Sequence, residues 1–120
     1  MAELSVNAEN KENVRVLYPA GYINAHTVQD FEKSLQSVLD EEQFRIVINC
    51  KELEYINSSG LGVLMGVIED IQDNDGFLFL SDMNDTVFNI FDTLGFTHLF
   101  KVFEKEAEAH EHIQSSKADA

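Results

Sequence analysis

Two adjacent serines, Ser58 and Ser59, stand at the start of an apolar run that continues to Ile68. A serine hydroxyl at such a point can be a nucleophile, a donor to a bound phosphate, an acceptor of a phosphoryl group, or a helix cap. Each role requires different neighbours, so the residues around the serines distinguish between them.

The neighbours do not match the nucleophile of a serine hydrolase. The strand-turn-helix elbow of those enzymes has glycine two positions before the serine and two positions after it. Ser58 has Ile56 at the first of these positions, and Ser59 has Asn57 and Leu61 at the two. A small hydrolase is therefore a minor alternative, and it is contradicted if a serine-directed phosphonate probe fails to label the protein.

The glycines that follow the serines do not match a nucleotide-binding loop. In a dinucleotide fingerprint the glycines lie in the tight turn directly after a strand. Here residues 51–57 separate the preceding strand from Gly60 and Gly62, and no lysine follows as in a P-loop. His110 and His112 do not share a helix face. The sequence therefore predicts no cofactor and no metal site.

Two roles remain open for Ser58. Asn57 or Ser58 can cap the helix predicted over residues 58–73 by accepting hydrogen bonds from first-turn N–H groups. Ser58 can also accept a phosphoryl group, because N–H groups and the macrodipole at a helix start favour a dianion. Such a phosphate would add charge and bulk to a partner-facing surface, which is a local electrostatic switch.

Composition limits the partners and the compartment. The chain has 120 residues, 44% of them hydrophobic, and its 8 basic and 22 acidic residues give a net charge of −14. This balance argues against nucleic acid and against an anionic membrane surface. Cys50 is the single cysteine, which fits a reducing compartment. With no signal architecture and no apolar run longer than 60–68, we predict a cytoplasmic protein without membrane insertion.

The hydrophobic pattern predicts an α/β fold. Alternation over residues 3–8, a turn at 10–13 and a strand at 14–21 ended by its proline and glycine predict an antiparallel hairpin. Strands and helices then alternate. The predicted strands are 44–50, 77–80 and 100–103. The predicted helices begin at Thr27, which forms a weak capping-box pattern with Asp30, at Ser58, after a cap at Asp85 or Thr86, and at Glu104.

This order indicates a mixed, mostly parallel sheet of about five strands with about four helices. Residues 1–120 are predicted to form a single domain. Residues 104–120 are expected to be a polar C-terminal helix and tail that is exposed to solvent and frays.

Several stretches of the sequence resemble parts of a known protein family. The stretch YINSSGLGVL, residues 55–64, resembles the signature of the STAS domain family, the bacterial anti-sigma factor antagonists. Residues 21–27 resemble the family's loop between the second strand and the first helix. Residues 46–49 resemble its central strand, and residues 94–96 the end of its third helix. The resemblance covers nearly the whole chain and implies the same α/β fold.

The resemblance implies a binding switch and no enzyme activity. The unphosphorylated form would bind an anti-sigma factor, itself a serine kinase using ATP and Mg²⁺, and so release the sigma factor. Phosphorylation on the first serine, Ser58, would end binding, and a separate serine phosphatase would restore it. The alternative is a STAS accessory subunit that regulates a transporter or lipid-transport complex without phosphorylation.

The resemblance also implies where the partner binds. The family commonly has acidic residues where this chain has Asn57, Tyr22 and Asn24, so negative charge is removed near Ser58. The glycines would allow either close approach of the partner or close packing inside the domain. Leu61, Val63 and Met65 would be either exposed partner contacts on a spare apolar helix face or part of the core. The predicted partner-binding residues are Tyr22, Asn24, Asn57, Ser59, Gly60, Leu61, Gly62, Val63 and Met65.

Overall fold

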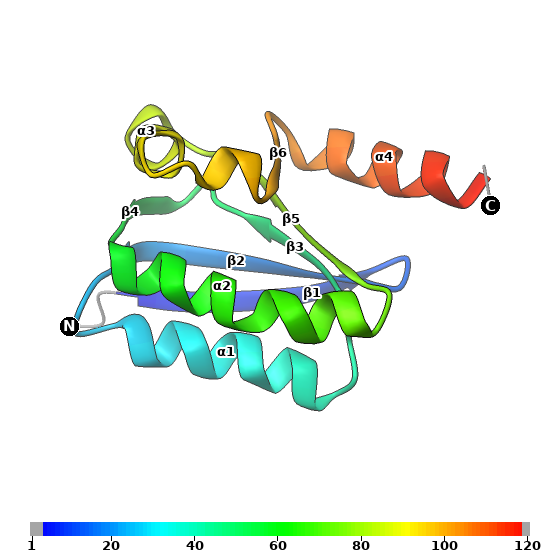
Figure 1. The fold of residues 1–120 in the computed structure, drawn as a ribbon, viewed down its shortest axis with the longest axis horizontal. Coiled ribbons are helices and arrows are strands. Elements are labelled where there is room, and N and C mark those ends of the chain that lie inside the picture. The colour runs from blue at the N-terminus through cyan, green and yellow to red at the C-terminus, as the bar shows by residue number, and fades with distance from the viewer. Residues whose placement is uncertain (1–3, 119–120) are drawn as a thin grey trace.

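The computed structural model describes residues 4–118 and shows helices on both faces of a mixed sheet (Figure 1). The strands are β1 (Leu4–Lys11), β2 (Val14–Ile23), β3 (Arg45–Asn49), β4 (Leu53–Ile56), β5 (Phe77–Ser81) and β6 (Lys101–Phe103). The helices are α1 (Val28–Asp40), α2 (Ser58–Asp73), α3 (Asp85–Thr93) and α4 (Glu106–Ala118), with a 3-10 turn η1 (Phe96–His98). The predicted fold class is confirmed. Among the described residues, no helix is long and apolar enough to cross a membrane.

The first two strands form the predicted antiparallel hairpin at one edge of the sheet. The turn is shorter than predicted, because both strands extend until only Glu12 and Asn13 remain between them. These two residues have φ of 51° and 69°. Positive φ at both central positions is typical of the type I′ turn, whose twist matches that of the flanking strands.

The strand β2 continues through Pro19, which the sequence pattern placed at its end. It pairs in parallel with β3 through residues 15–17 and with β4 through residues 21–23. Pro19 lies between these two ladders, where β2 has no neighbour on that side and a missing N–H is tolerated. Gly21, with φ of 112°, marks a register shift in the β4 ladder.

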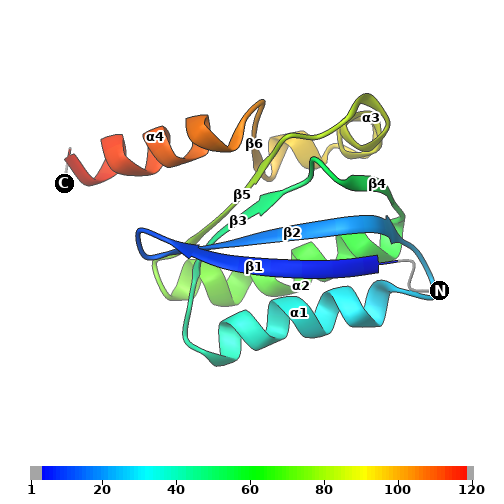
Figure 2. The same ribbon diagram turned by 180° about the vertical axis from the view of Figure 1, so that it is seen from behind.

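The strand β4 was not predicted, because its four residues lack a clear alternation. It leads directly into α2, so it determines where the serine pair is presented. With β4, the sheet formed by residues 4–118 has six strands, in the order β1-β2-β3-β5-β6 with β4 beside β2 (Figure 2).

The main core lies between the sheet and the helices α1 and α2. Its fully buried members include Ile23, Phe31, Ile48, Leu64 and Ile71. Burying such side chains contributes about 1.5–3 kcal/mol each relative to leaving them in water.

The C-terminal helix α4 lies on the opposite face of the sheet (Figures 1 and 2). Ala109 and Ile113 are buried there against Val14, Val16 and Val47. The prediction of a helix exposed to solvent is therefore wrong for this part of α4. Two apolar side chains one helical turn apart were too weak a pattern to indicate burial. Residues 119–120 of the predicted tail lie outside the described residues.

Two predicted helix caps differ from the structure. Thr27 precedes α1, but its side chain makes no cap hydrogen bond to the helix. The helix α3 is capped by Asn84, whose Oδ1 accepts from the N–H of Val87 at 2.8 Å, and not by Asp85 or Thr86. The Thr27 side chain contacts the end of β2 instead, where its Oγ1 donates to the Tyr22 carbonyl at 2.7 Å.

Candidate functional site

The start of α2 is held by Asn57 from two directions. Its Oδ1 accepts a hydrogen bond from the N–H of Gly60 at 2.9 Å, and its own N–H donates to the Ile23 carbonyl at 3.0 Å. Asn57 is therefore the helix cap, and it also ties the helix start to the end of β2. Ser58 is the first residue of α2, and its side chain is exposed.

Gly60 was predicted to contact the partner, but it is buried and faces the interior of the domain. A β-carbon there would lie 2.7 Å from Ile23 Cγ2 and 2.7 Å from Ile56 Cγ1. Both isoleucines are buried core residues. The missing side chain lets the first turn of α2 approach the ends of β2 and β4 closely, which positions Ser58 at the surface.

The other predicted contacts on α2 divide between core and surface. Leu61 is 1% exposed and belongs to the core, so it too is not a partner contact. Val63 is half-buried and packs against the same core. Gly62 is exposed with open space above it, and Met65 is 40% exposed. The exposed part of the helix start therefore consists of Ser58, Ser59, Gly62 and Met65.

The loop between β2 and α1 lies beside this helix start and is held by internal hydrogen bonds. Thr27 Oγ1, which donates to Tyr22, also accepts from the N–H of Asn24 at 2.9 Å. Asn24 Oδ1 accepts from the N–H of His26 at 2.9 Å. Tyr22, in contrast, leaves its side chain 45% exposed. Tyr22 and Asn24 flank Ile23 in the sequence, so the hydrogen bond from the Asn57 N–H to the Ile23 carbonyl places this segment beside the start of α2.

Tyr55 is a surface residue of this region that sequence reasoning did not assign. It lies on β4 in register with Tyr22 on β2, and its side chain is 40% exposed. No local sequence pattern indicated that Tyr55 lies beside Tyr22, because β4 itself was not predicted. The pairing of β4 with β2 also joins residues that are far apart in the sequence.

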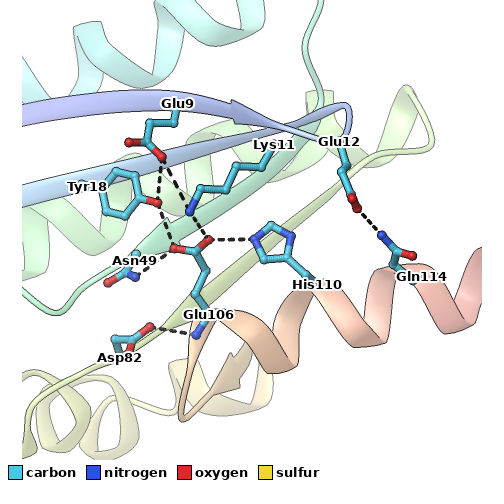
Figure 3. Close-up of polar contacts among 9 residues, drawn as sticks. All are labelled: Glu9, Lys11, Glu12, Tyr18, Asn49, Asp82, Glu106, His110 and Gln114. Atoms are coloured by element: carbon cyan, nitrogen blue, oxygen red, sulfur yellow. Dashed lines mark hydrogen bonds and ion pairs between the residues drawn. The ribbon is translucent and has the colours of Figure 1, made fainter.

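A second polar cluster, also missed by sequence reasoning, surrounds Glu106 on the opposite face of the sheet (Figure 3). Its carboxylate accepts from Tyr18 Oη at 3.0 Å and Asn49 Nδ2 at 3.0 Å through one oxygen, and from Lys11 Nζ at 2.9 Å through the other. His110 Nε2 lies 2.8 Å from that second oxygen. The cluster joins α4 to β1, β2 and β3.

The charge state of the cluster follows from these contacts. Burial by itself raises the pKa of the Glu106 carboxyl. The hydrogen bonds that it makes with Lys11, Asn49, His110 and Tyr18 outweigh this effect and lower the pKa to about 2. The pKa of Lys11 is raised, chiefly by its hydrogen bond to Glu106. Glu106 and Lys11 therefore form an ion pair at neutral pH that ties α4 to β1.

Cys50, the single cysteine, is free and buried. Burial, with a smaller effect of Asp82, raises the pKa of the Cys50 thiol to about 12, so this thiol is not a ready nucleophile. Within residues 4–118, no three histidine, cysteine or acidic side chains are grouped so that they could hold a metal ion.

Comparison with known proteins identifies the family. The family model described as the STAS domain matches residues 5–109. The chain belongs to the STAS domain family. This STAS chain is 25% identical over 107 residues to the anti-sigma F factor antagonist of Paenibacillus polymyxa, covering 88% of this chain and 92% of that protein. It is 24% identical over 106 residues to the anti-sigma-B factor antagonist of Listeria monocytogenes, covering 88% and 93%.

Solved structures share the STAS fold. The anti-sigma factor antagonist of Mycobacterium paratuberculosis matches with a TM-score of 0.84 and 18% identity, covering 92% of this chain and 94% of that chain. The unphosphorylated anti-sigma factor antagonist SpoIIAA matches with a TM-score of 0.78 and 19% identity, covering 92% and 97%. The phosphorylated Bacillus SpoIIAA matches with a TM-score of 0.68 and 19% identity, covering 91% and 99%. At these identities the likeness shows the fold.

The cap at Asn57 leads to a first prediction. Asn57→Ala is expected to lower the free energy of unfolding by about 1 kcal/mol, because the Gly60 N–H loses its partner. Asn57→Asp keeps an acceptor at the same position and is expected to retain the wild-type value. Urea unfolding followed by circular dichroism measures both. Equal destabilisation by the two variants would contradict the capping role.

Proposed function

We propose that this STAS protein is an anti-sigma factor antagonist controlled by phosphorylation of Ser58. The unphosphorylated form binds an anti-sigma factor that is also a serine kinase, and so releases the sigma factor. Phosphorylation of Ser58 ends binding, and a serine phosphatase restores it. The observation that carries the proposal is the exposed Ser58 hydroxyl at the first position of α2, held there by Asn57 and Gly60.

Two further observations support the proposal. The relatives that match nearly the whole chain are named anti-sigma factor antagonists, and a matching SpoIIAA structure is of a phosphorylated form. The position is also chemically suitable, because the first-turn N–H groups of a helix have no intrahelical partner and carry partial positive charge. A phosphate on Ser58 is therefore compatible with the folded domain.

The effect on binding follows from charge and desolvation. A phosphoserine carries about −1.5 to −2 charges at neutral pH. The other exposed residues of the first two turns of α2 are Ser59, Gly62 and Met65, which are uncharged. A partner that packs closely on such a surface would have to bury the dianion or move away from it. Phosphorylation therefore converts a favourable contact into an unfavourable one.

The experiment that tests this proposal uses the anti-sigma factor kinases of the same cell. Each is incubated with ATP, Mg²⁺ and the wild-type protein, Ser58→Ala or Ser59→Ala, and the intact mass is measured. We expect one phosphate on the wild type and on Ser59→Ala, and none on Ser58→Ala. Ser59 is the matched control, because it is the adjacent serine and is also exposed.

Binding is measured in parallel by size-exclusion chromatography. The unphosphorylated wild type and Ser58→Ala are expected to form a complex with the kinase, whereas Ser58→Asp is not. Phosphate on Ser58→Ala, or equal binding by Ser58→Asp, would contradict the proposed switch. Complex formation without any phosphorylation would identify the protein as a constitutive binder.

A further inference from the structure

A pocket of about 270 Å³ opens where the start of α3 meets the end of β6. The strands β5 and β6 are parallel, so the pocket lies at their carboxyl ends, where open α/β sheets commonly bind ligands. The helix α3 lies at the end of the sheet away from the β1–β2 turn (Figures 1 and 2). The pocket is lined by Met83, Asp85, Phe88, Val102, Phe103 and Glu104. None of these residues belongs to the surface proposed to bind the anti-sigma factor.

The two walls of the pocket are fixed by hydrogen bonds that need no ligand. On the α3 side, Asn84 Oδ1 accepts from the N–H of Val87 at 2.8 Å, and Asn84 Nδ2 donates to the Leu53 carbonyl at 3.2 Å. On the β6 side, the N–H of Asp82 donates to the Phe103 carbonyl at 3.2 Å. The pocket is therefore formed before a ligand arrives, and binding requires little ordering of the chain.

Much of the pocket surface is apolar. Met83 and Val102 are half-buried and pack against the main core, whereas the side chain of Phe88 is 41% exposed. The core face of α3 is formed by Val87 and Phe91, so Phe88 is not needed for that packing. The volume lies just below the range of about 300–1,000 Å³ for drug-sized ligands. The pocket therefore suits a ligand of about one aromatic ring.

Two carboxylates stand at this pocket, Asp85 from α3 and Glu104 from the end of β6, and both residues are exposed. Within the described residues, neither carboxylate has a hydrogen bond or an ion pair. Lys101 Nζ lies 5.8 Å from the centre of the Phe103 ring and pairs with neither of them. Asp85 also favours the start of α3 as an acidic residue of its first turn, whereas Glu104 lies outside the helices.

The combination of apolar surface and unpaired carboxylates indicates the charge of the ligand. An anion would be repelled by both carboxylates and by the net charge of −14. A metal ion would lack ligands, because no three histidine, cysteine or acidic side chains of residues 4–118 are grouped to hold one. An organic cation places its apolar body on the pocket wall and its charge near the carboxylates, and it is attracted to an aromatic ring as well.

We propose that this pocket binds a small organic cation, a protonated amine on an apolar body of about one aromatic ring. The ammonium group lies near Asp85 and Glu104, and the body lies against Met83, Phe88 and Val102. The proposal goes beyond the proposed function and does not depend on it, because no residue of the Ser58 switch takes part. Since such a ligand contacts both α3 and β6, its binding stabilises the folded state.

The test uses two ligands of the same shape and different charge. These are 2-phenylethylamine, which is protonated at neutral pH, and 2-phenylethanol, which is uncharged. Each is titrated up to about 10 mM, the range for ligands of this size, into the full-length ¹⁵N-labelled protein, and amide signals are followed by NMR. We expect the amine to shift the signals of residues 83–88 and 102–104 saturably. The alcohol is expected to bind about tenfold more weakly, because it lacks the attraction to two carboxylates.

Two variants test the assigned contacts. Glu104→Gln keeps the shape of the side chain and is expected to raise the Kd of the amine about threefold, the size of an exposed ion pair. Phe88→Ala removes the exposed ring and is expected to raise it about tenfold. The matched controls are Glu111→Gln, an exposed acidic residue on α4, and Leu99→Ala, a 58% exposed apolar residue outside the pocket. Both controls are expected to leave the Kd unchanged.

The outcomes decide on the pocket and on the ligand class separately. Absence of saturable shifts with the amine, or shifts confined to other segments, would overturn the site. Equal binding of the alcohol would overturn the assignment to a cation. Equal effects of the control variants would overturn the location. Thermal unfolding shows that each variant retains its fold, and the amine is expected to raise the Tm of the wild type more than that of Phe88→Ala.

Discussion

Replacing Gly60 with alanine is expected to lower the free energy of unfolding by roughly 2 kcal/mol, within the range for overpacked cores. The new methyl group would lie 2.7 Å from side-chain atoms of both Ile23 and Ile56. These isoleucines are 0% and 1% exposed, and β-branched side chains have few alternative rotamers, so the helix start has to move instead. Alanine's better helix propensity, at most about 1 kcal/mol, offsets only part of this cost.

The matched controls for Gly60 are the two other glycines of the same helix. A β-carbon at Gly62 or Gly66 meets nothing within 4 Å. Gly62→Ala and Gly66→Ala are therefore expected to raise the free energy of unfolding by about 0.5–1 kcal/mol through helix propensity and chain entropy. Urea unfolding measures all three variants. Destabilisation of the same size at all three positions would contradict the specific packing role of Gly60.

The Gly60 result also bears on the proposed switch. A displaced first turn would weaken the contacts of Asn57 and move Ser58, so Gly60→Ala is expected to be phosphorylated more slowly than the wild type. Gly62→Ala keeps the fold and adds a methyl group on the exposed face of α2. It therefore tests partner contact at that face separately from stability.

Replacing Glu106 with alanine is expected to lower the free energy of unfolding by roughly 2–3 kcal/mol, the range for loss of charged, partly buried hydrogen bonds. The largest part of this cost arises at Asn49, which is 4% exposed and whose Nδ2 would lose its acceptor. Lys11 loses less, because its ammonium lies 3.6 Å from the Glu9 carboxylate and is partly exposed to water. Glu111→Ala is the control, since Glu111 is an exposed acidic residue on the same helix.

Two measurements check the Glu106 prediction. Urea unfolding gives the loss of stability, and hydrogen exchange read by mass spectrometry shows where protection is lost. We expect faster exchange in α4, whose attachment depends on Glu106, Ala109 and Ile113. Unchanged exchange in α4, or an equal effect of Glu111→Ala, would contradict the attachment role.

The pH dependence of this contribution has a defined sign. The folded pKa of Glu106 is about 2, below the ordinary value of 4.5, so the carboxylate is favoured by the folded state. The stability that Glu106 contributes is therefore fully present above about pH 4.5 and is lost as the pH falls towards 2. The difference in unfolding free energy between the wild type and Glu106→Ala should shrink over that window. A difference that grew on acidification would contradict the assignment.

Local patterns in the sequence determined the order of most elements and the chemistry of the serine pair. The hairpin, the helix over residues 58–73 and the strand at Phe77–Ser81 were predictable, because alternation, helical periodicity and turn residues act between near neighbours. The same holds for a serine at a helix start with asparagine before it. The position of Ser58 at the first turn of a helix follows from these features, whereas its placement at the surface also requires Gly60 to pack against β2 and β4.

The direction in which particular residues face was decided only by the tertiary structure. Gly60 and Gly62 are two residues apart in one motif, yet one packs on Ile23 and the other faces solvent. Leu61 enters the core although the sequence allowed it on the surface. The reason is that the side of α2 that faces the core is set by its packing against β2 and β4. The strand β4 is short, and its pairing depends on residues about 30 positions earlier in the sequence.

The Glu106 cluster and the pairing of Tyr22 with Tyr55 depend on the tertiary structure for the same physical reason. Glu106 meets Lys11 across a separation of 95 residues, and its role is invisible in a charged C-terminal segment. Tyr22 and Tyr55 become neighbours only when β4 adds to β2. Contacts of this kind form only when strands distant in the sequence pair and the final helix covers one part of the sheet. The spacing of residues within a short segment therefore cannot predict them.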